Sequence, residues 1–253
     1  MTVNPELSYD VYQIDPMKES STERLYEQVA RKIAHHAIRE KHGVLPIEAD
    51  LCRDLSVSRT VLREAIKMLS AKGMVEVSPK RGTNIQPREK WNLLDPDILE
   101  WHAECRTDDE AFVRSLCEVR QFLEPAAAEL AAERATADEV KQLYWHLDEM
   151  ATNVDIAEKF IAADLKFHAI IFSSTRNDLL QYIADAIGGA LRASRSITVL
   201  RPGSSAASLP LHRSVADAIR DRDPVSARAA MIYLVRSAAR DIYHVRLSNL
   251  EKR

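Results

Sequence analysis

The segment SVSRTVLREAIKMLS, residues 56–70, places four polar side chains at the start of a helix with an apolar seam. The seam recurs at the spacing of one helix face, which predicts packing against a neighbouring helix. Ser58 and Thr60 carry hydroxyl groups that can donate hydrogen bonds to phosphates. Arg59 and Arg63 lie one turn apart, so both can reach guanine O6 and N7 or the DNA backbone. Each arginine taken alone is also typical of an ordinary exposed surface.

A second pair of residues, Asp164 and His168, has the chemistry of a metal site. Their spacing of four positions puts the two side chains next to each other on one helix face. A carboxylate beside a neutral imidazole suits a divalent metal of the Zn, Ni or Mn type. The competing interpretation is a hydrogen-bonded pair in the core or on the surface, because this spacing occurs often by chance.

The chain that must position these residues has 253 residues, enough for two domains with separate cores. Its composition is 46% hydrophobic and 29% charged with only six glycines, which argues against sheet-rich and dinucleotide-binding folds and favours a mostly helical protein. Residues 21–88 contain 13 Lys and Arg against 8 Asp and Glu, whereas the remainder contains 22 against 30. A basic module suggests a polyanionic partner, with a solvated charged face as the alternative.

Cysteine content and hydropathy exclude several other classes of protein. Cys52, Cys105 and Cys117 are odd in number and form no C-x-x-C pair, so neither a disulfide framework nor a thiolate zinc site is indicated. No N-terminal signal pattern occurs, and no apolar run approaches the ~20 residues that span a bilayer. We therefore expect a cytoplasmic protein with no membrane partner.

The N-terminal part predicts an arm followed by a winged helix-turn-helix over residues 21–88. Residues 1–20 lack a helical period and contain two prolines, so we expect a flexible arm. Apolar positions at helical spacing predict a first helix near residues 25–38 and a short second helix near residues 45–55. A tight turn then leads into the quoted segment, and two helices joined in this way predict a helix-turn-helix.

A small β-hairpin is expected after Gly73, which can end the preceding helix. The stretches MVEV and TNIQ alternate with a period of two and flank a turn that contains Pro and Gly. The tip of this hairpin carries Lys80 and Arg81, which would enter a minor groove or bind phosphates, and Gly82 would allow a close approach of the backbone.

The C-terminal part predicts an all-α bundle over residues 108–253, joined through a linker at residues 89–107. The stretch PREKWNLLDPDILEWH, residues 87–102, contains two prolines and the amphipathic Trp91 and Trp101, which suit a linker that docks on a neighbouring surface. The rest has a helical period with breaks that divide it into six or seven helices. These breaks lie near residues 136–138, 152–155, 175–178, 201–210 and 221–224.

Residues 45–85 resemble a known family of DNA-binding proteins. The stretch LPIEADLCRDLSVSRTVLREAIKMLSAKGMVEVSPKRGTNI is similar to the winged-helix signature of GntR-type transcription regulators, LPxExxLAxxLxVSRxxVRxALxxLxxxGLVxxxxGRGxxV. The matching positions imply recognition-helix arginines at Arg59 and Arg63, a phosphate contact at Thr60, and the wing at Arg81 and Gly82. Ala49 stands where many members have a base-contacting arginine, so either Arg53 substitutes for it or the operator preference differs.

Three later stretches resemble the FCD domain of the FadR subfamily of these regulators. They are LCEVRQFLEPAAAELAAERAT, DLKFHAIIFSSTRNDLL and LHRSVADAIRDRDPVSARAAM. The resemblance implies an effector-binding and dimerisation domain with a divalent metal held by Asp164, His168 and a third ligand, His212. The fourth ligand of the family, a histidine 22 residues further on, is replaced here by Leu234. Water or an effector oxygen would then complete the coordination, or the metal would bind weakly or not at all.

The same resemblance implies an effector pocket near these residues. Arg120 offers a forked guanidinium for a carboxylate, and Asn177 can contact a hydroxyl or a carboxylate. The alternative for Arg120 is an internal ion pair with Glu124, one turn later on the same helix. Arg192 and Arg195 are weaker candidates for this pocket, and we expect them on the surface.

Together these features predict a homodimeric regulator that responds to a ligand, a repressor that leaves a palindromic operator in double-stranded DNA when a small acid binds. The linker WNLLDPDILEW and the missing fourth ligand are similar to sugar-acid regulators of the subfamily. A galactonate-like aldonate would suit Arg120, Asn177 and the three metal-site residues. The alternatives are an effector that is another small carboxylate, a metalloenzyme built on the metal-site residues, and a winged helix used only for protein contacts. No general-base motif accompanies the metal-site residues, so we expect no enzyme.

Overall fold

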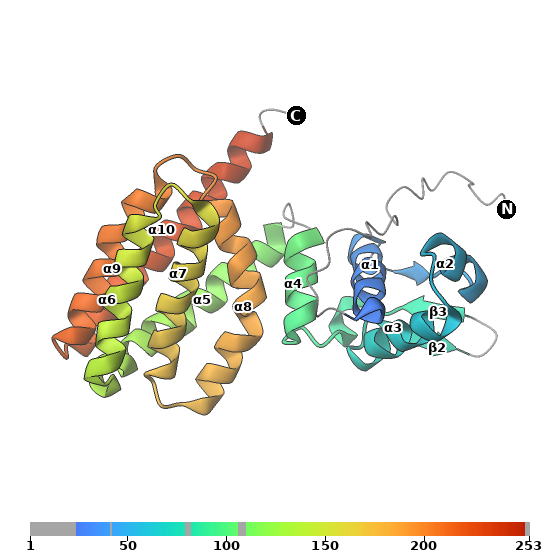
Figure 1. Ribbon diagram of the computed structural model, residues 1–253, viewed down its shortest axis with the longest axis horizontal. Coiled ribbons are helices and arrows are strands. Elements are labelled where there is room, and N and C mark those ends of the chain that lie inside the picture. The colour runs from blue at the N-terminus through green and yellow to red at the C-terminus, as the bar shows by residue number, and fades with distance from the viewer. Residues whose placement is uncertain (1–23, 41, 79–81, 106–109, 251–253) are drawn as a thin grey trace. The chain divides into compact units, whose positions relative to one another are not determined.

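The computed structural model describes residues 24–40, 42–78, 82–105 and 110–250 (Figure 1). The chain forms two compact units, Met1–Arg106 and Thr107–Arg253. The described residues are mostly helical, which confirms the predicted fold class. No helix among them is long and apolar enough to cross a membrane. The expected arm at residues 1–20 lies outside the described residues.

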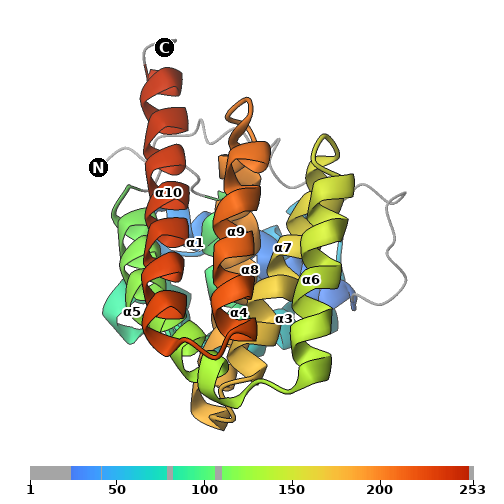
Figure 2. The ribbon, with the colours of Figure 1, turned by 90° about the vertical axis from the view of Figure 1, so that its left-hand side faces the viewer.

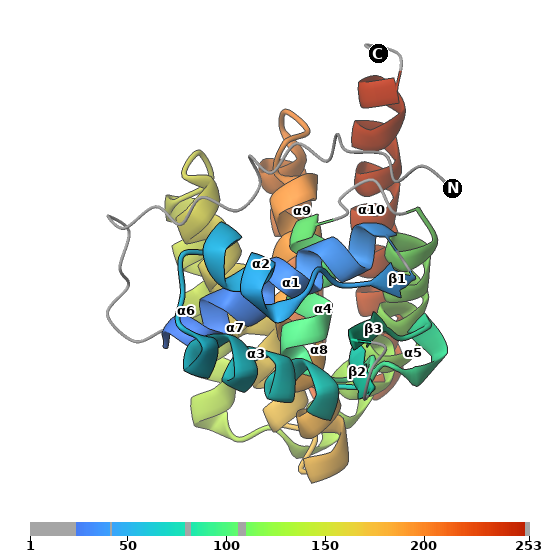
Figure 3. The ribbon, with the colours of Figure 1, turned by 90° about the vertical axis from the view of Figure 1, so that its right-hand side faces the viewer.

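The first unit contains α1 (Leu25–Glu40) and the predicted helix-turn-helix, made by α2 (Glu48–Asp54) and α3 (Arg59–Ala71). Figure 3 shows these three helices together with the hairpin. The apolar seam of α3 is buried through Leu62, Ala65 and Leu69, while the opposite face of the helix remains exposed. Burial of this seam against α1 and α2 leaves the polar start of α3 facing solvent.

The predicted hairpin is confirmed as β2 (Val75–Ser78) and β3 (Gly82–Ile85), which pair antiparallel with Val75 opposite Ile85. A short strand that the sequence pattern did not predict, β1 (Gly43–Val44), pairs with the other edge of β3. The sheet therefore has the order β1-β3-β2. Gly73 has φ +75° between α3 and β2, and a Cβ there would lie 2.2 Å from the carbonyl oxygen of Lys90.

The segment expected as a linker forms a 3-10 turn, η2 (Arg88–Lys90), and a helix, α4 (Pro96–Cys105). Trp91, Ile98 and Trp101 are buried in the same apolar cluster as the helix-turn-helix. The indole Nε1 of Trp91 donates a hydrogen bond of 2.8 Å to the carbonyl of Gln86. Lys72 at the end of α3 donates to Asp95 at 2.7 Å, so the segment is tied to the recognition helix. The segment 89–105 is thus part of the first unit's core.

The second unit contains six helices among the described residues. They are α5 (Glu110–Arg134), α6 (Ala137–Thr152), α7 (Ala157–Ser173), α8 (Asp178–Thr198), α9 (Ser204–Arg220) and α10 (Pro224–Leu250). Helix α9 packs between α6 and α10, and the three lie side by side in Figure 2. Helix α7 contacts α5, α6 and α8, and its buried residues include the polar Asp164 and His168.

Helix boundaries fall at the predicted breaks with one exception. The break expected over residues 201–210 is shorter, because α9 begins at Ser204 and includes Pro210. Gly203, with φ +78°, provides the left-handed residue that starts this helix. The helix therefore starts two turns before His212 and places that imidazole in the interior.

Candidate functional site

The start of α3 presents the polar residues singled out in the sequence. The Oγ of Ser58 accepts a hydrogen bond of 3.3 Å from the backbone N–H of Val61 and so caps the helix. This bond uses an acceptor lone pair and leaves the hydroxyl proton available to a phosphate. Arg59 and Thr60 follow in the first turn, and both are exposed. The positive end of the helix dipole adds to the attraction for an anion.

The two remaining arginines of the helix-turn-helix are paired with acids. The Nε of Arg63 lies 3.2 Å from Glu48 on α2, and the Arg63 side chain is 67% exposed. Arg53 on α2 lies 2.9 Å from Asp50 and 3.1 Å from Asp54. Exposed ion pairs of this kind contribute little to stability, so DNA phosphates and bases can replace the acids as partners.

The wing is only partly described. Lys80 and Arg81 lie outside the described residues, so their expected roles stay predictions. Gly82 opens β3 opposite Ser78 with φ +77°, a conformation that glycine adopts without strain.

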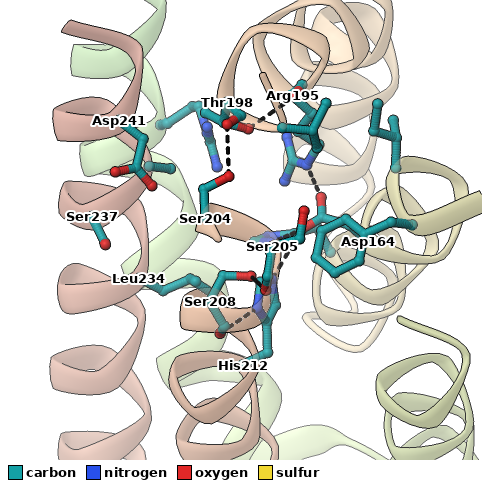
Figure 4. Close-up of a pocket in the computed structure, with 16 residues that line it drawn as sticks. Asp164, Arg195, Thr198, Ser204, Ser205, Ser208, His212, Leu234, Ser237 and Asp241 are labelled. Atoms are coloured by element: carbon teal, nitrogen blue, oxygen red, sulfur yellow. Dashed lines mark hydrogen bonds and ion pairs between the residues drawn. The ribbon is translucent and has the colours of Figure 1, made fainter. Parts of the chain in front are cut away.

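A pocket inside the second unit gathers most of the predicted effector and metal residues. Asp164 and His168 come from α7, His212 from α9, and Arg120 from α5. All four side chains are buried. Figure 4 shows Asp164 and His212 approaching each other from two helices, with Arg195 of α8 beside them.

The three candidate metal ligands meet the geometric requirement for a divalent ion. One donor atom from each of Asp164, His168 and His212 lies within 4.8 Å of the others. His212 Nδ1 lies 2.9 Å from the carbonyl oxygen of Ser208, which can only accept, so Nδ1 carries the proton. Burial, and then the neighbouring His168, lower the pKa of His212 to about 3, so the ring is neutral. Its Nε2 lone pair therefore faces Asp164 Oδ1 at 3.0 Å, and a cation would fit these two donors.

Two other residues change the character of this donor set. Leu234 of α10 lines the pocket where the family resemblance implies a fourth ligand, and its side chain offers none. Arg195 forms an ion pair with Asp164 Oδ2, so that carboxylate already has a cationic partner. The donor atoms of this chain thus fit a metal, while Asp164 is shared with a guanidinium.

Arg120 combines the two roles considered from the sequence. Its Nε donates to Glu124 Oε1 at 2.6 Å, with both side chains buried, and Arg120 also lines the pocket. His168 Nδ1 lies 2.9 Å from Glu124 Oε2. Burial alone would raise the pKa of Glu124, but Arg120 and His168 hold it well below its usual range. Glu124 is therefore a charged anchor that positions both Arg120 and His168.

Arg195, a weaker candidate in the sequence, is one of the residues that line the pocket. It was expected on the surface, yet it is 5% exposed and lines the pocket, whereas Arg192 is exposed. Burial, and then repulsion from Arg120, lower the pKa of Arg195 to about 9, so it is charged at neutral pH. The stripe of Ile187, Leu191 and Arg195 at intervals of four residues is the signal that indicates its burial.

Asn177 is not among the residues that line the pocket. Its Oδ1 accepts hydrogen bonds from the backbone N–H groups of Leu179 and Leu180 at 3.1 and 3.2 Å. It is the N-cap of α8, about 27 Å along the helix from Arg195 at 1.5 Å per residue. We therefore assign Asn177 a capping role in place of the effector contact expected from the sequence.

Hydroxyl groups make up much of the rest of the pocket wall. They belong to Thr198, Ser204, Ser205, Ser208 and Ser237. Ser204 donates to the carbonyl of Thr198 at 2.7 Å, and Ser208 donates to that of Ser205 at 2.8 Å. Each of these oxygens keeps lone pairs for a ligand hydroxyl. The wall is therefore suited to a polar molecule with several hydroxyl groups.

A winged helix followed by a helical unit with a charged internal pocket is the arrangement of a bacterial transcriptional regulator. The family model "Bacterial regulatory proteins, gntR family" matches residues 21–85, and the FCD domain model matches residues 115–237. The Galactonate operon transcriptional repressor of Escherichia coli (strain K12) is 33% identical over 227 residues, 89% of this chain and 98% of that protein. The chain therefore belongs to the GntR family of transcriptional regulators, with a C-terminal FCD domain. The families and relatives that it matches are transcriptional regulators and not enzymes.

Two further comparisons agree with this assignment. The Uxu operon transcriptional regulator of Escherichia coli (strain K12) is 30% identical over 168 residues, 64% of this chain and 62% of that protein. Among solved structures, that of Lar, which controls the expression of the Listeria monocytogenes agr system, has a TM-score of 0.62 at 17% identity and covers 88% of this chain and 98% of that chain. The latter likeness shows the fold.

Proposed function

We propose that this regulator represses genes for the catabolism of a sugar acid and leaves its operator when the acid binds in the pocket of the helical unit. The observation that carries the proposal is the combination of buried Arg120 with a wall of hydroxyl groups. A guanidinium is suited to a carboxylate, and the hydroxyls are suited to the polyol chain of an aldonate. The similarity to the galactonate operon repressor supports this class of ligand.

Asp164, His168 and His212 would hold a divalent ion of the Zn, Ni or Mn type when one is bound. Such an ion would supply a Lewis-acidic centre for a carboxylate or hydroxyl oxygen of the acid. The side chains act in the same way in either case: Glu124 orients Arg120 and His168, and Ser208 fixes the tautomer of His212.

For DNA recognition we propose that the two DNA-binding units of a homodimer, one from each chain and here called heads, read a palindromic operator in double-stranded DNA. A single recognition helix reaches only a few base pairs, so a two-fold axis doubles the contacts. Arg59 and Arg63 would read bases, with Arg53 as an additional contact. The DNA backbone would be bound or approached by five further residues: Ser58, Thr60, Lys80, Arg81 and Gly82.

Coupling between the sites follows from differential binding. If the acid binds more tightly to a conformer whose two DNA-binding units do not match both half-sites, its binding lowers the affinity for the operator. Operator binding then lowers the affinity for the acid by the same factor.

Fluorescence anisotropy on DNA from the region upstream of the protein's own gene tests this proposal. The complex is titrated with D-galactonate and related aldonates, with and without a chelator, and with the neutral sugar D-galactose as the control. Release by one acid but not by D-galactose at micromolar to millimolar concentration is expected. Release by a different small carboxylate would keep the regulator and replace the effector class, and tight binding that no acid alters would contradict the proposal.

A further inference from the structure

We propose that Arg195 takes the place of a metal ion in this pocket: its guanidinium neutralises Asp164 and presents its remaining N–H groups to the carboxylate of the ligand. The identity of that ligand as a sugar acid rests on the proposed function, whereas the competition with a metal does not. Metal binding and the Asp164 to Arg195 pair would then be alternatives within one site.

The two carboxylate oxygens of Asp164 have different partners. One carboxylate oxygen pairs with Arg195, and the other faces His212 Nε2 at 3.0 Å. All three side chains are buried and come from α7, α8 and α9, so solvent screens them little. A guanidinium and a divalent ion would draw on the same single negative charge and would repel each other. Occupation by Arg195 therefore weakens the metal site even though its donor atoms are in place.

The Arg195 guanidinium keeps N–H groups that are not paired with Asp164. Its Nη1 and Nη2 atoms are buried, and within the described part of the chain no hydrogen-bond partner accompanies them. Buried donors normally have partners, so two unpaired N–H groups in a pocket wall indicate a ligand that accepts hydrogen bonds. The fork matches the two oxygens of a carboxylate.

Arg120 is a second guanidinium in the pocket. It lines the same pocket as Arg195, and both guanidinium groups are buried. Each arginine has one buried acid as a partner, Glu124 for Arg120 and Asp164 for Arg195. An anion that reaches both guanidinium groups would relieve their repulsion, and no metal is needed for this.

Metal titration tests the competition without any effector. Chelator-treated wild-type protein and the variant Arg195→Met are titrated with Ni²⁺ and with Zn²⁺ by isothermal calorimetry. The variant should bind about 10 to 100-fold more tightly, and the added substitution His212→Ala should remove the gain. Arg192→Met, on the exposed face one turn earlier, should behave as wild type. Equal metal affinity in wild type and Arg195→Met would overturn the proposal.

Ligand titration tests the anion contact. With chelator present, wild-type protein should bind D-galactonate and Arg195→Met should bind it roughly 30-fold more weakly or worse. Arg195→Lys keeps the charge without the fork, so it should still exclude the metal and bind the acid with intermediate affinity. Circular dichroism and operator binding verify that each variant is folded. Undiminished D-galactonate binding by Arg195→Met would remove Arg195 from the ligand site, whereas failure of every variant and of wild type to bind would contradict only the proposed effector.

Discussion

Arg63 and Glu48 face each other across the turn of the helix-turn-helix, and both are accessible to solvent. Such a pair holds the guanidinium extended over the surface that we assign to DNA, while its low strength allows exchange of the acid for a base. Under the proposed DNA contact, Glu48 would be a temporary partner of Arg63.

Replacing Arg63 with alanine should weaken operator binding by about 1 to 3 kcal/mol and relax the sequence preference at the base it contacts. Arg39→Ala, in the exposed last turn of α1, removes the same charge outside the helix-turn-helix and is the matched control. Anisotropy titrations on operator and scrambled DNA measure both effects. An Arg63→Ala protein with the same preference and affinity as Arg39→Ala would exclude Arg63 from base contact.

Arg120 requires a more careful substitution, because its partner Glu124 is also buried. Removal of Arg120 alone would leave an unpaired buried carboxylate, at a cost of about 3 to 5 kcal/mol in stability. The double variant Arg120→Met with Glu124→Gln removes both charges at similar volume. We expect it to bind operator normally and to lose release by the acid. Release by the acid at wild-type concentrations from the double variant would show that Arg120 does not bind the effector.

At the level of single residues, the sequence indicated part of the pocket. Asp164 and His168 were identifiable because their four-residue spacing requires one helix face, and resemblance to the family added His212. Arg195 was wrongly expected on the surface because its partner Asp164 lies 31 residues earlier on another helix, and only packing of α7 against α8 brings them together. Asn177 was expected at the pocket, but the structure places it at the N-cap of α8; Asn serves equally well as a helix cap and as a ligand contact, so its type alone did not distinguish the two.

Among the elements, the junction of α3 and β2 depends on one glycine. Gly73 has φ +75°, and a Cβ would meet the Lys90 carbonyl oxygen at 2.2 Å. Gly82 has nearly the same φ, but among the described residues its added Cβ would meet only Val44, at 3.5 Å. The two positions therefore share the conformational cost and differ in the steric one.

Gly73→Ala should destabilise the first unit by at least about 2 kcal/mol more than Gly82→Ala, which should lose about 1 kcal/mol. Urea unfolding followed by the fluorescence of the buried Trp91 and Trp101 measures the difference in the free energy of unfolding. Equal losses in the two variants would mean that the backbone near Lys90 moves aside without cost.

Elements with a strong period were predictable, and those fixed by tertiary contact were not. Helical spacing of apolar residues located α3 and the helices of the second unit, since each buries one face. Strand β1 has only two residues, too few for a period, and exists because β3 offers it an edge. The residues before α4 contain Pro, Asp and Asn, which are typical of a linker. Docking of Trp91 and Trp101 was predictable from their amphipathic side chains, but their burial in the core of the first unit depends on tertiary contacts.

For the whole molecule, the proposed dimer makes tight operator binding depend on both DNA-binding units, each on its own half-site. Scrambling one half-site should weaken binding by about 100-fold or more, because the second head then contributes only nonspecific contacts. Analytical ultracentrifugation should give twice the mass of one chain at the concentrations used for binding. A monomer in solution, or a half-site that binds as tightly as the full operator, would contradict this arrangement.

The burial of Trp91, Ile98 and Trp101 in the first unit also bears on how such regulators are recombined. The DNA-binding family model ends at residue 85, but the folded head continues through α4 to Cys105. A head cut near residue 88 and grafted onto another sensor would lose three large side chains from its core and leave an apolar surface uncovered. The transferable module extends to Cys105, so gene fusions that exchange sensors should be joined after that residue.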